Sequence, residues 1–270
     1  MWLECLWEER LNKKVRFLTA SLFLSLFFFL LLLVPYSWRY QALLLLSFLT
    51  AMVYWWSLRL LFSNGWFLKM MVVLLPLSLI IGLSLFLAML SLSLFFKLLF
   101  AVFIAFLFYV IFLVENIFLV AIGYKTVPLY RSAYTVSLIL VLLTAFFLFD
   151  SLFSFRFMYY WNAFGVLLIS LVLFSYQFWA IRIELSDDGS DKSMAYVWVP
   201  ALIMAELAMV FSFWPVGIFK GSVYLVSFIY IISGLMQAEI RDRLFKKTWK
   251  SLLWVLGSLV MAMLVATKWG

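Results

Sequence analysis

Long apolar runs separated by short polar segments dominate the pattern of this sequence. Nine runs have about the length that a helix needs to cross a bilayer, roughly 17 residues or more. They are Val15–Val34, Gln41–Phe62, Met70–Leu90, Leu98–Gly123, Ala133–Phe149, Tyr159–Ile181, Met194–Trp214, Val223–Glu239 and Ser251–Thr267. The alternating segments of about ten residues that mark a transmembrane β-barrel are absent. The pattern therefore predicts an all-α, polytopic transmembrane helical bundle of about nine spans.

The composition agrees with this prediction. The 270 residues are 68% hydrophobic and only 12% charged, whereas soluble domains are about half apolar and about a quarter charged. The segments between spans are short, so we expect residues 1–270 to form a single membrane-embedded domain. In residues 1–14, Leu3, Leu6, Trp7 and Leu11 recur at helical spacing. This segment is either a helix on the inner membrane surface or a solvated tail.

Basic residues are distributed unevenly between alternate connecting segments. If the N-terminus lies inside, fifteen of the 20 Lys and Arg residues fall on the inner side and five on the outer side. The positive-inside rule then predicts an inner N-terminus and an outer C-terminus. Because the positive charges lie beside the spans, we expect them to contact anionic lipid of the inner leaflet rather than nucleic acid. We expect the protein in the plasma membrane.

The sequence contains no histidine, and Cys5 is its only cysteine. Catalysis by a Ser-His-Asp triad, His-ligated zinc or haem, and proton transfer through imidazole are therefore excluded for these residues. A disulfide framework and a thiolate metal site are excluded as well. We expect no resident cofactor, and enzymatic activity is the less favoured interpretation.

Two carboxylates lie deep within apolar spans. Glu115, which is followed by Asn116, lies about eight residues from the inner end of its span, and Glu206 lies near the middle of another. An ionised carboxylate at such depth costs about 2.5–3.5 kcal/mol on insertion scales, so each should face protein or water, be paired, or be protonated. By depth, the nearest candidate cations are Arg59 and Arg131. Each carboxylate either binds a proton or cation in a transport path or fixes the packing of helices.

Polar and small residues also form stripes at helical spacing within several spans. One span carries Ser47, Thr50, Tyr54 and Ser57, and another carries Tyr224, Ser227, Tyr230, Gly234 and Gln237. Helix packing is the more common reason for such stripes. The second stripe is the more polar, so Tyr230 and Gln237 are our first candidates for the lining of a cavity.

An acidic loop follows the sixth span, with Asp187, Asp188 and Asp191 as weak candidates for metal ligands. The position of this loop and the nine-helix layout with an inner N-terminus resemble the membrane prenyltransferases of the ubiquinone-pathway type. The resemblance implies an enzyme that uses aspartates to hold magnesium against a diphosphate. Those enzymes have a further acidic motif between helices two and three, where this chain reads Ser63-Asn64-Gly65-Trp66.

Three functional hypotheses follow from the sequence. The first is a small transporter or channel-like protein with intramembrane carboxylates. The second is a non-catalytic membrane subunit or scaffold, whose carboxylates only hold helices together. A more remote one is a magnesium-dependent, prenyltransferase-like enzyme. The substrate, the oligomeric state and any protein partner are left open by the sequence.

Overall fold

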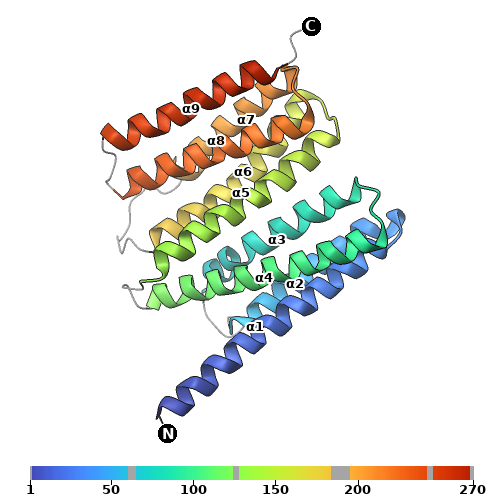
Figure 1. Ribbon diagram of the computed structural model, residues 1–270, viewed down its shortest axis with the longest axis vertical. Coiled ribbons are helices and arrows are strands. Elements are labelled where there is room, and N and C mark those ends of the chain that lie inside the picture. The colour runs from blue at the N-terminus through green and yellow to red at the C-terminus, as the bar shows by residue number, and fades with distance from the viewer. Residues whose placement is uncertain (1, 60–64, 124–127, 184–194, 242–245, 268–270) are drawn as a thin grey trace. The chain divides into compact units, whose positions relative to one another are not determined.

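The computed structural model describes residues 2–59, 65–123, 128–183, 195–241 and 246–267. For residues 2–11, 36 and 246–248 it describes the backbone only. Within these ranges every regular element is helical, which confirms the predicted polytopic helical bundle. The elements, in order along the chain, are α1 (Trp2–Leu33), the short 3₁₀ helix η1 (Tyr36–Trp38), α2 (Arg39–Ser57), α3 (Trp66–Ala88), α4 (Leu94–Gly123), α5 (Tyr130–Ser154), α6 (Tyr159–Arg182), α7 (Ala195–Phe213), α8 (Ile218–Ile240) and α9 (Lys246–Ala266) (Figure 1).

Eight of the described helices are long and apolar enough to cross a membrane. α2 is the long helix that does not meet this criterion. Its 19 residues would still extend about 28 Å, close to the thickness of the hydrocarbon core. Its lower hydropathy comes from polar and hydroxyl-bearing residues, several of which face the protein interior, as the next subsection describes. The chain is an integral membrane protein with many spanning helices.

The chain divides into two compact units, residues 1–120 and 121–270. In the first unit, α1 packs against α2, and α2 packs against α3. The Ser25 hydroxyl on α1 donates a 2.6 Å hydrogen bond to the Ala101 carbonyl on α4, which ties α4 to α1. The sequence-based prediction of a single membrane-embedded domain stays a prediction.

In the second unit, α6 and α7 pack against each other along much of their length, and α5 packs against both α6 and α8. α9 contacts α8 and is the least buried spanning helix, with 6% of its apolar window inside the protein.

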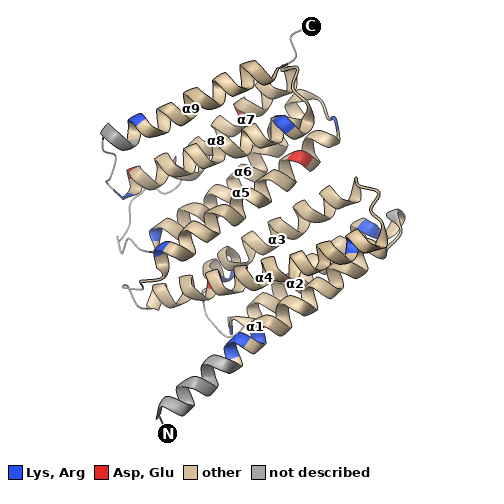
Figure 2. Cartoon of the chain, viewed as in Figure 1, with Lys and Arg blue, Asp and Glu red and all other residues tan. Residues whose placement is uncertain are grey.

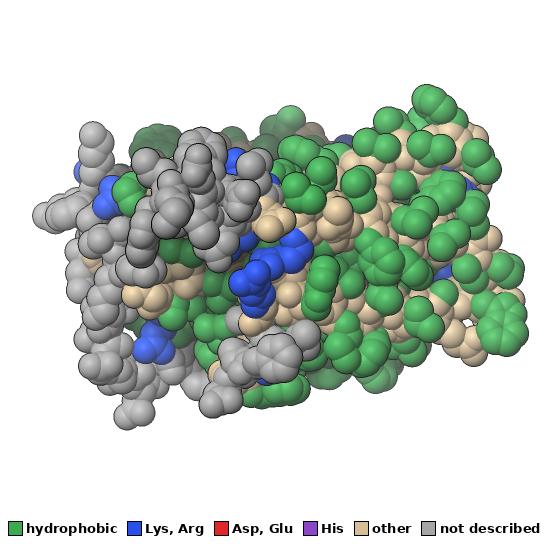
Figure 3. Space-filling model, turned by 90° about the horizontal axis from the view of Figure 1, so that it is seen from below, with side chains coloured by type: hydrophobic (Ala, Val, Ile, Leu, Met, Phe, Trp, Pro, Cys, Tyr) green, Lys and Arg blue, Asp and Glu red, His purple; other side chains and the backbone are tan. Residues whose placement is uncertain are grey.

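Charged residues lie mainly near helix ends, as the colouring of Lys, Arg, Asp and Glu along the chain shows (Figure 2). On the face seen in Figure 3, hydrophobic side chains cover most of the described surface, and basic side chains gather toward one end. This distribution suits a protein whose helix sides contact lipid and whose ends contact head groups and water.

Candidate functional site

α2 buries a hydroxyl-bearing face. Its buried residues are Leu46, Thr50, Tyr54 and Ser57, and the last three carry hydroxyl groups. Spacings of four and three residues place them on one side of the helix. Most of the stripe noted in the sequence is therefore directed into the first unit, which gives that unit a polar line through its core.

A stack of three aromatic rings holds the middle of this line in place. The rings of Tyr54 on α2 and Phe112 on α4 lie 4.0 Å apart and 14° from parallel. Phe112 also stacks with Phe17 on α1, with ring centroids 5.6 Å apart and ring planes 5° from parallel. All three side chains are buried. Because the stack joins three helices, it fixes the position of Tyr54 relative to α4.

Glu115 lies on α4 one turn beyond Phe112, and its side chain is completely buried. The Tyr54 side chain and the Glu115 carboxyl are close enough to interact electrostatically. Glu115 lies eight residues before the end of α4 at Gly123, or about 12 Å along the helix axis. The structure thus places this buried carboxyl within electrostatic range of the buried Tyr54 side chain.

Two hydroxyls of the polar line retain hydrogen-bonding capacity. The Thr50 hydroxyl donates to the Leu46 carbonyl at 2.7 Å, as is common for hydroxyls within helices. Among the described residues, by contrast, the Tyr54 hydroxyl and the Ser57 Oγ have no hydrogen-bond partner. Buried polar atoms are nearly always hydrogen bonded, so such exceptions call for an explanation.

We refer to Phe17, Tyr54, Ser57, Phe112 and Glu115 as the Glu115 cluster, and two arginines lie next to its members in the chain. Arg16 precedes Phe17, and Arg59 follows Ser57 by two positions. Their guanidinium groups are close enough to repel each other, and that of Arg16 also lies 5.7 Å from the Phe17 ring centroid. Arg59 has a positive φ of 57° and is exposed. Arg59 was a candidate from the sequence, whereas Arg16 entered there only among the fifteen basic residues of the inner side.

Asn116, Arg131 and Glu206 are other candidate residues from the sequence. Asn116 is half-buried on α4, directly after Glu115, and Arg131 is exposed in the second unit. Glu206 is exposed, although it is the twelfth of the 19 residues of α7. The two deep carboxylates therefore belong to different units, and of the two only Glu115 is buried.

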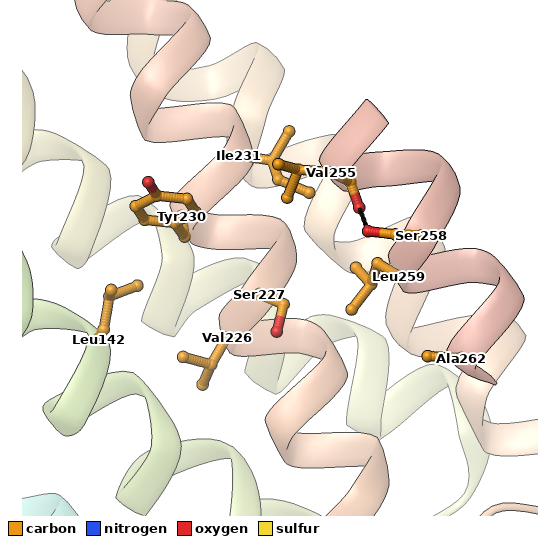
Figure 4. A pocket seen from close by; sticks show the side chains of 9 residues that line it. All are labelled: Leu142, Val226, Ser227, Tyr230, Ile231, Val255, Ser258, Leu259 and Ala262. Carbon is orange, nitrogen blue, oxygen red and sulfur yellow. Dashed lines mark hydrogen bonds between the residues drawn. The ribbon is translucent and has the colours of Figure 1, made fainter. Parts of the chain in front are cut away.

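Tyr230 and Ser227 of α8 line a cavity of about 460 Å³ that α5 and α9 complete, as Figure 4 shows. The hydroxyls of Ser227 and of Ser258, on α9, donate to carbonyls of their own helices, Val223 and Val255. The remaining lining is aliphatic. Gln237, also on α8, is half-buried and is not among the residues that line this cavity.

A second polar group, which the sequence analysis missed, lies inside the second unit. The Tyr134 hydroxyl on α5 donates to Gln177 Oε1 on α6 at 3.2 Å, and the Arg241 guanidinium lies 5.5 Å from the Tyr134 ring centroid. A signal was present in the sequence, because Ser170 and Gln177 are polar and seven residues apart within one apolar span.

The candidate metal ligands Asp187, Asp188 and Asp191 lie outside the described residues. Among the described residues, no group of three or more acidic, Cys or His side chains could hold a metal ion. The magnesium-dependent hypothesis therefore stays a prediction from the sequence.

In a comparison with known families, a family model matches residues 32–267 of the chain. The match extends over most of the chain, from the end of α1 to the end of α9. The chain belongs to the family described as "Protein of unknown function (DUF5656)". No curated protein and no solved structure matches the chain. The Glu115 cluster except Phe17, and the cavity that Tyr230 lines, fall within the part that the DUF5656 family model covers.

Proposed function

We propose that the protein is a small transporter or channel-like protein of the plasma membrane, in which Glu115 binds a proton or a cation. The observation that carries the proposal is the buried hydroxyl line of α2, in which Tyr54 lies within electrostatic range of the buried Glu115 carboxyl. A line that served only to pack helices would be expected to satisfy its hydroxyls within the protein. Here the Tyr54 and Ser57 hydroxyls can still accept and donate hydrogen bonds.

In this mechanism, Glu115 is the binding group and α2 supplies the relay toward the inner membrane surface. Tyr54 and Ser57 are one turn apart, and Ser57 is the last residue of α2. A proton or a cation would pass between Arg59 at the helix end and Glu115 along these hydroxyls. A carboxyl is suited to this role because it is an oxygen ligand that changes its charge when it takes up a proton.

The test is ion flux into liposomes that contain the purified protein. A potassium diffusion potential drives proton entry, which a trapped pH-sensitive dye reports, and gradients of sodium and potassium are tested in parallel. We expect flux through the wild type and none above empty liposomes through Glu115→Gln. Glu239→Gln, which changes an exposed carboxylate at the end of α8, serves as the matched control and should retain flux. Wild-type protein without flux of any of these ions, or equal flux through both variants, would contradict the proposal.

A second candidate function, a non-catalytic membrane subunit, is favoured by Glu206. A carboxylate exposed near the middle of a spanning helix is costly in lipid and is stabilised when another protein surface covers it. Light scattering after mild detergent extraction distinguishes the two functions. A subunit would elute at a mass well above 31.7 kDa and would dissociate after Glu206→Leu. If the wild type and Glu206→Leu are both monomers, the subunit function is ruled out.

A further inference from the structure

The polar line of α2 is tightly enclosed where it approaches Glu115. The side chains of Tyr54, Ser57, Phe112 and Glu115 are all 0% exposed. The Tyr54 ring stacks on the Phe112 ring with centroids 4.0 Å apart, and it meets the Phe108 ring edge-on at 6.4 Å. Rings in parallel contact at 4.0 Å leave no room for a water molecule between them. An ion that binds Glu115 must therefore reach it without a complete hydration shell.

The line offers few oxygen atoms to a metal cation. A cation that leaves water needs protein oxygens in place of its hydration shell, and Mg²⁺ and Ca²⁺ take about six to eight. The side-chain oxygens here are the hydroxyls of Thr50, Tyr54 and Ser57 and the Glu115 carboxyl. Thr50 and Ser57 lie at opposite ends of the three, about 10 Å apart along the axis of α2. Hydroxyls spread over this length do not surround one cation.

The described part of the first unit has a single carboxylate. Within residues 12–120, Glu115 is the only acidic side chain that the structure describes. The other charged side chains described there are basic: Lys13, Lys14, Arg16, Arg39, Arg59, Lys69 and Lys97. A metal cation beside Glu115 would stay a buried charge that needs further ligands. A proton instead forms a neutral carboxyl group, which is the less costly form of the acid in an apolar interior.

Hydroxyl groups can pass on a proton, because each one both donates and accepts a hydrogen bond. The Tyr54 hydroxyl and the Ser57 Oγ are suited to this transfer, since neither has a hydrogen-bond partner among the described residues. When Ser57 accepts a proton, it gives its own proton to Tyr54, and Tyr54 gives its own proton to the Glu115 carboxylate. Both hydroxyls end as they began, and the carboxylate becomes a neutral acid.

We propose, on the basis of the proposed function, that the ion this protein carries is the proton and that the polar line of α2 excludes metal cations. Ser57, the last residue of α2, is the entry from the inner side, and Tyr54 is the intermediate. Glu115 holds the proton. The selectivity comes from the enclosure of the line, whose hydroxyls transfer a proton but do not coordinate a metal ion.

The test compares three ions in liposomes that contain the full chain. Proton entry is driven by a potassium diffusion potential and reported by a trapped pH-sensitive dye. Sodium and potassium entry are measured in separate liposomes with dyes selective for each ion. We expect proton entry, and no entry of sodium or potassium above that of empty liposomes. Proton entry should be unchanged when external sodium is replaced by the bulky cation N-methylglucamine.

Two serines of α2 provide a matched pair of variants. Ser57→Ala removes a hydroxyl of the line and should lower proton entry to the level of empty liposomes. Ser47→Ala is the control, because Ser47 is half-buried and its hydroxyl donates to the Leu43 carbonyl at 2.8 Å. This control should retain the proton entry of the wild type.

The outcomes separate proton selectivity from the proposed function. Proton entry alone, lost in Ser57→Ala and retained in Ser47→Ala, supports the proposal. Sodium or potassium entry that Glu115→Gln abolishes would overturn the selectivity and leave the proposed function standing. Equal proton entry through Ser57→Ala and Ser47→Ala would overturn the transfer along the hydroxyls. If the wild type carries none of the three ions, both the proposed function and its selectivity are wrong.

Discussion

The ring of Tyr54 on α2 stacks on the ring of Phe112 on α4, with centroids 4.0 Å apart and planes 14° from parallel. Because Glu115 follows Phe112 by one helical turn, the same contact that joins the two helices brings Tyr54 within electrostatic range of the Glu115 carboxyl. The aromatic stack is therefore the structural support of the candidate site, and the predictions begin with it.

Removing Phe112 should destabilise the first unit. Phe112→Ala deletes a fully buried ring and its stacking on Tyr54 and Phe17, so we expect a loss of about 2–4 kcal/mol in the free energy of unfolding. Denaturation in mild detergent, followed by circular dichroism, measures the change. Phe106→Ala, on the same helix with a 61% exposed ring, is the control and should be nearly neutral. Equal losses for the two variants would show that the stack does not support the fold.

Tyr54→Phe should separate stability from function. The variant retains the ring and removes a buried hydroxyl that has no hydrogen-bond partner among the described residues, so stability should stay the same or rise by up to about 1–3 kcal/mol. Ion flux should nevertheless fall, because the relay loses the Tyr54 hydroxyl.

The matched variant is Tyr134→Phe in the second unit. The Tyr134 hydroxyl donates to Gln177, so its removal should cost about 1 kcal/mol of stability. If Tyr54→Phe is less stable than Tyr134→Phe and retains full ion flux, the Tyr54 hydroxyl has a structural role and the proposed relay to Glu115 is wrong.

The two deep carboxyls should differ in their reaction with an apolar carbodiimide, which reaches protonated carboxyls from the lipid. Glu206 is exposed on α7, whereas Glu115 is completely buried. We expect Glu206 to be modified faster, as measured by mass spectrometry of proteolytic peptides over a time course. Faster modification of Glu115 would mean that the first unit opens to lipid at this depth, contrary to the structure.

Cysteine labelling tests whether α2 crosses the membrane. In a Cys5→Ser background, Ser93→Cys, in the segment between α3 and α4, should react with a membrane-impermeant maleimide from outside intact cells. Asn12→Cys should react only after permeabilisation. If α2 did not cross, Ser93→Cys would be protected on the inside, and the predicted number of spans would be wrong.

Hydropathy predicted the helices well because long apolar runs have one stable solution in a bilayer, which is to satisfy the backbone within a helix. The helix ends were harder to predict. α8 begins at Ile218, five residues before the predicted start at Val223, and α5 extends to Ser154, beyond Phe149. A helix continues into the head-group region as long as its backbone hydrogen bonds are made, and hydropathy does not report those bonds.

The site was only partly predictable. The sequence indicated Glu115 and the stripe through Tyr54, because a polar residue in an apolar span stands out. It did not indicate that α2 and α4 bring them together, since the rings of Phe17 and Phe112 look like any others among 31 phenylalanines. Nor could it show that Glu206 is exposed, because in a helix that is apolar on all sides the sequence does not reveal which face packs against protein.

The most direct test of the central claim is infrared spectroscopy of the Glu115 carboxyl in reconstituted membranes. If Glu115 binds and releases protons, wild-type protein should show a protonated carboxyl band that disappears reversibly as the pH is raised and that Glu115→Gln lacks. A wild-type spectrum without such a band, or a band that is retained in Glu115→Gln, would contradict the claim and would leave Glu115 as a structural member of the helix contact.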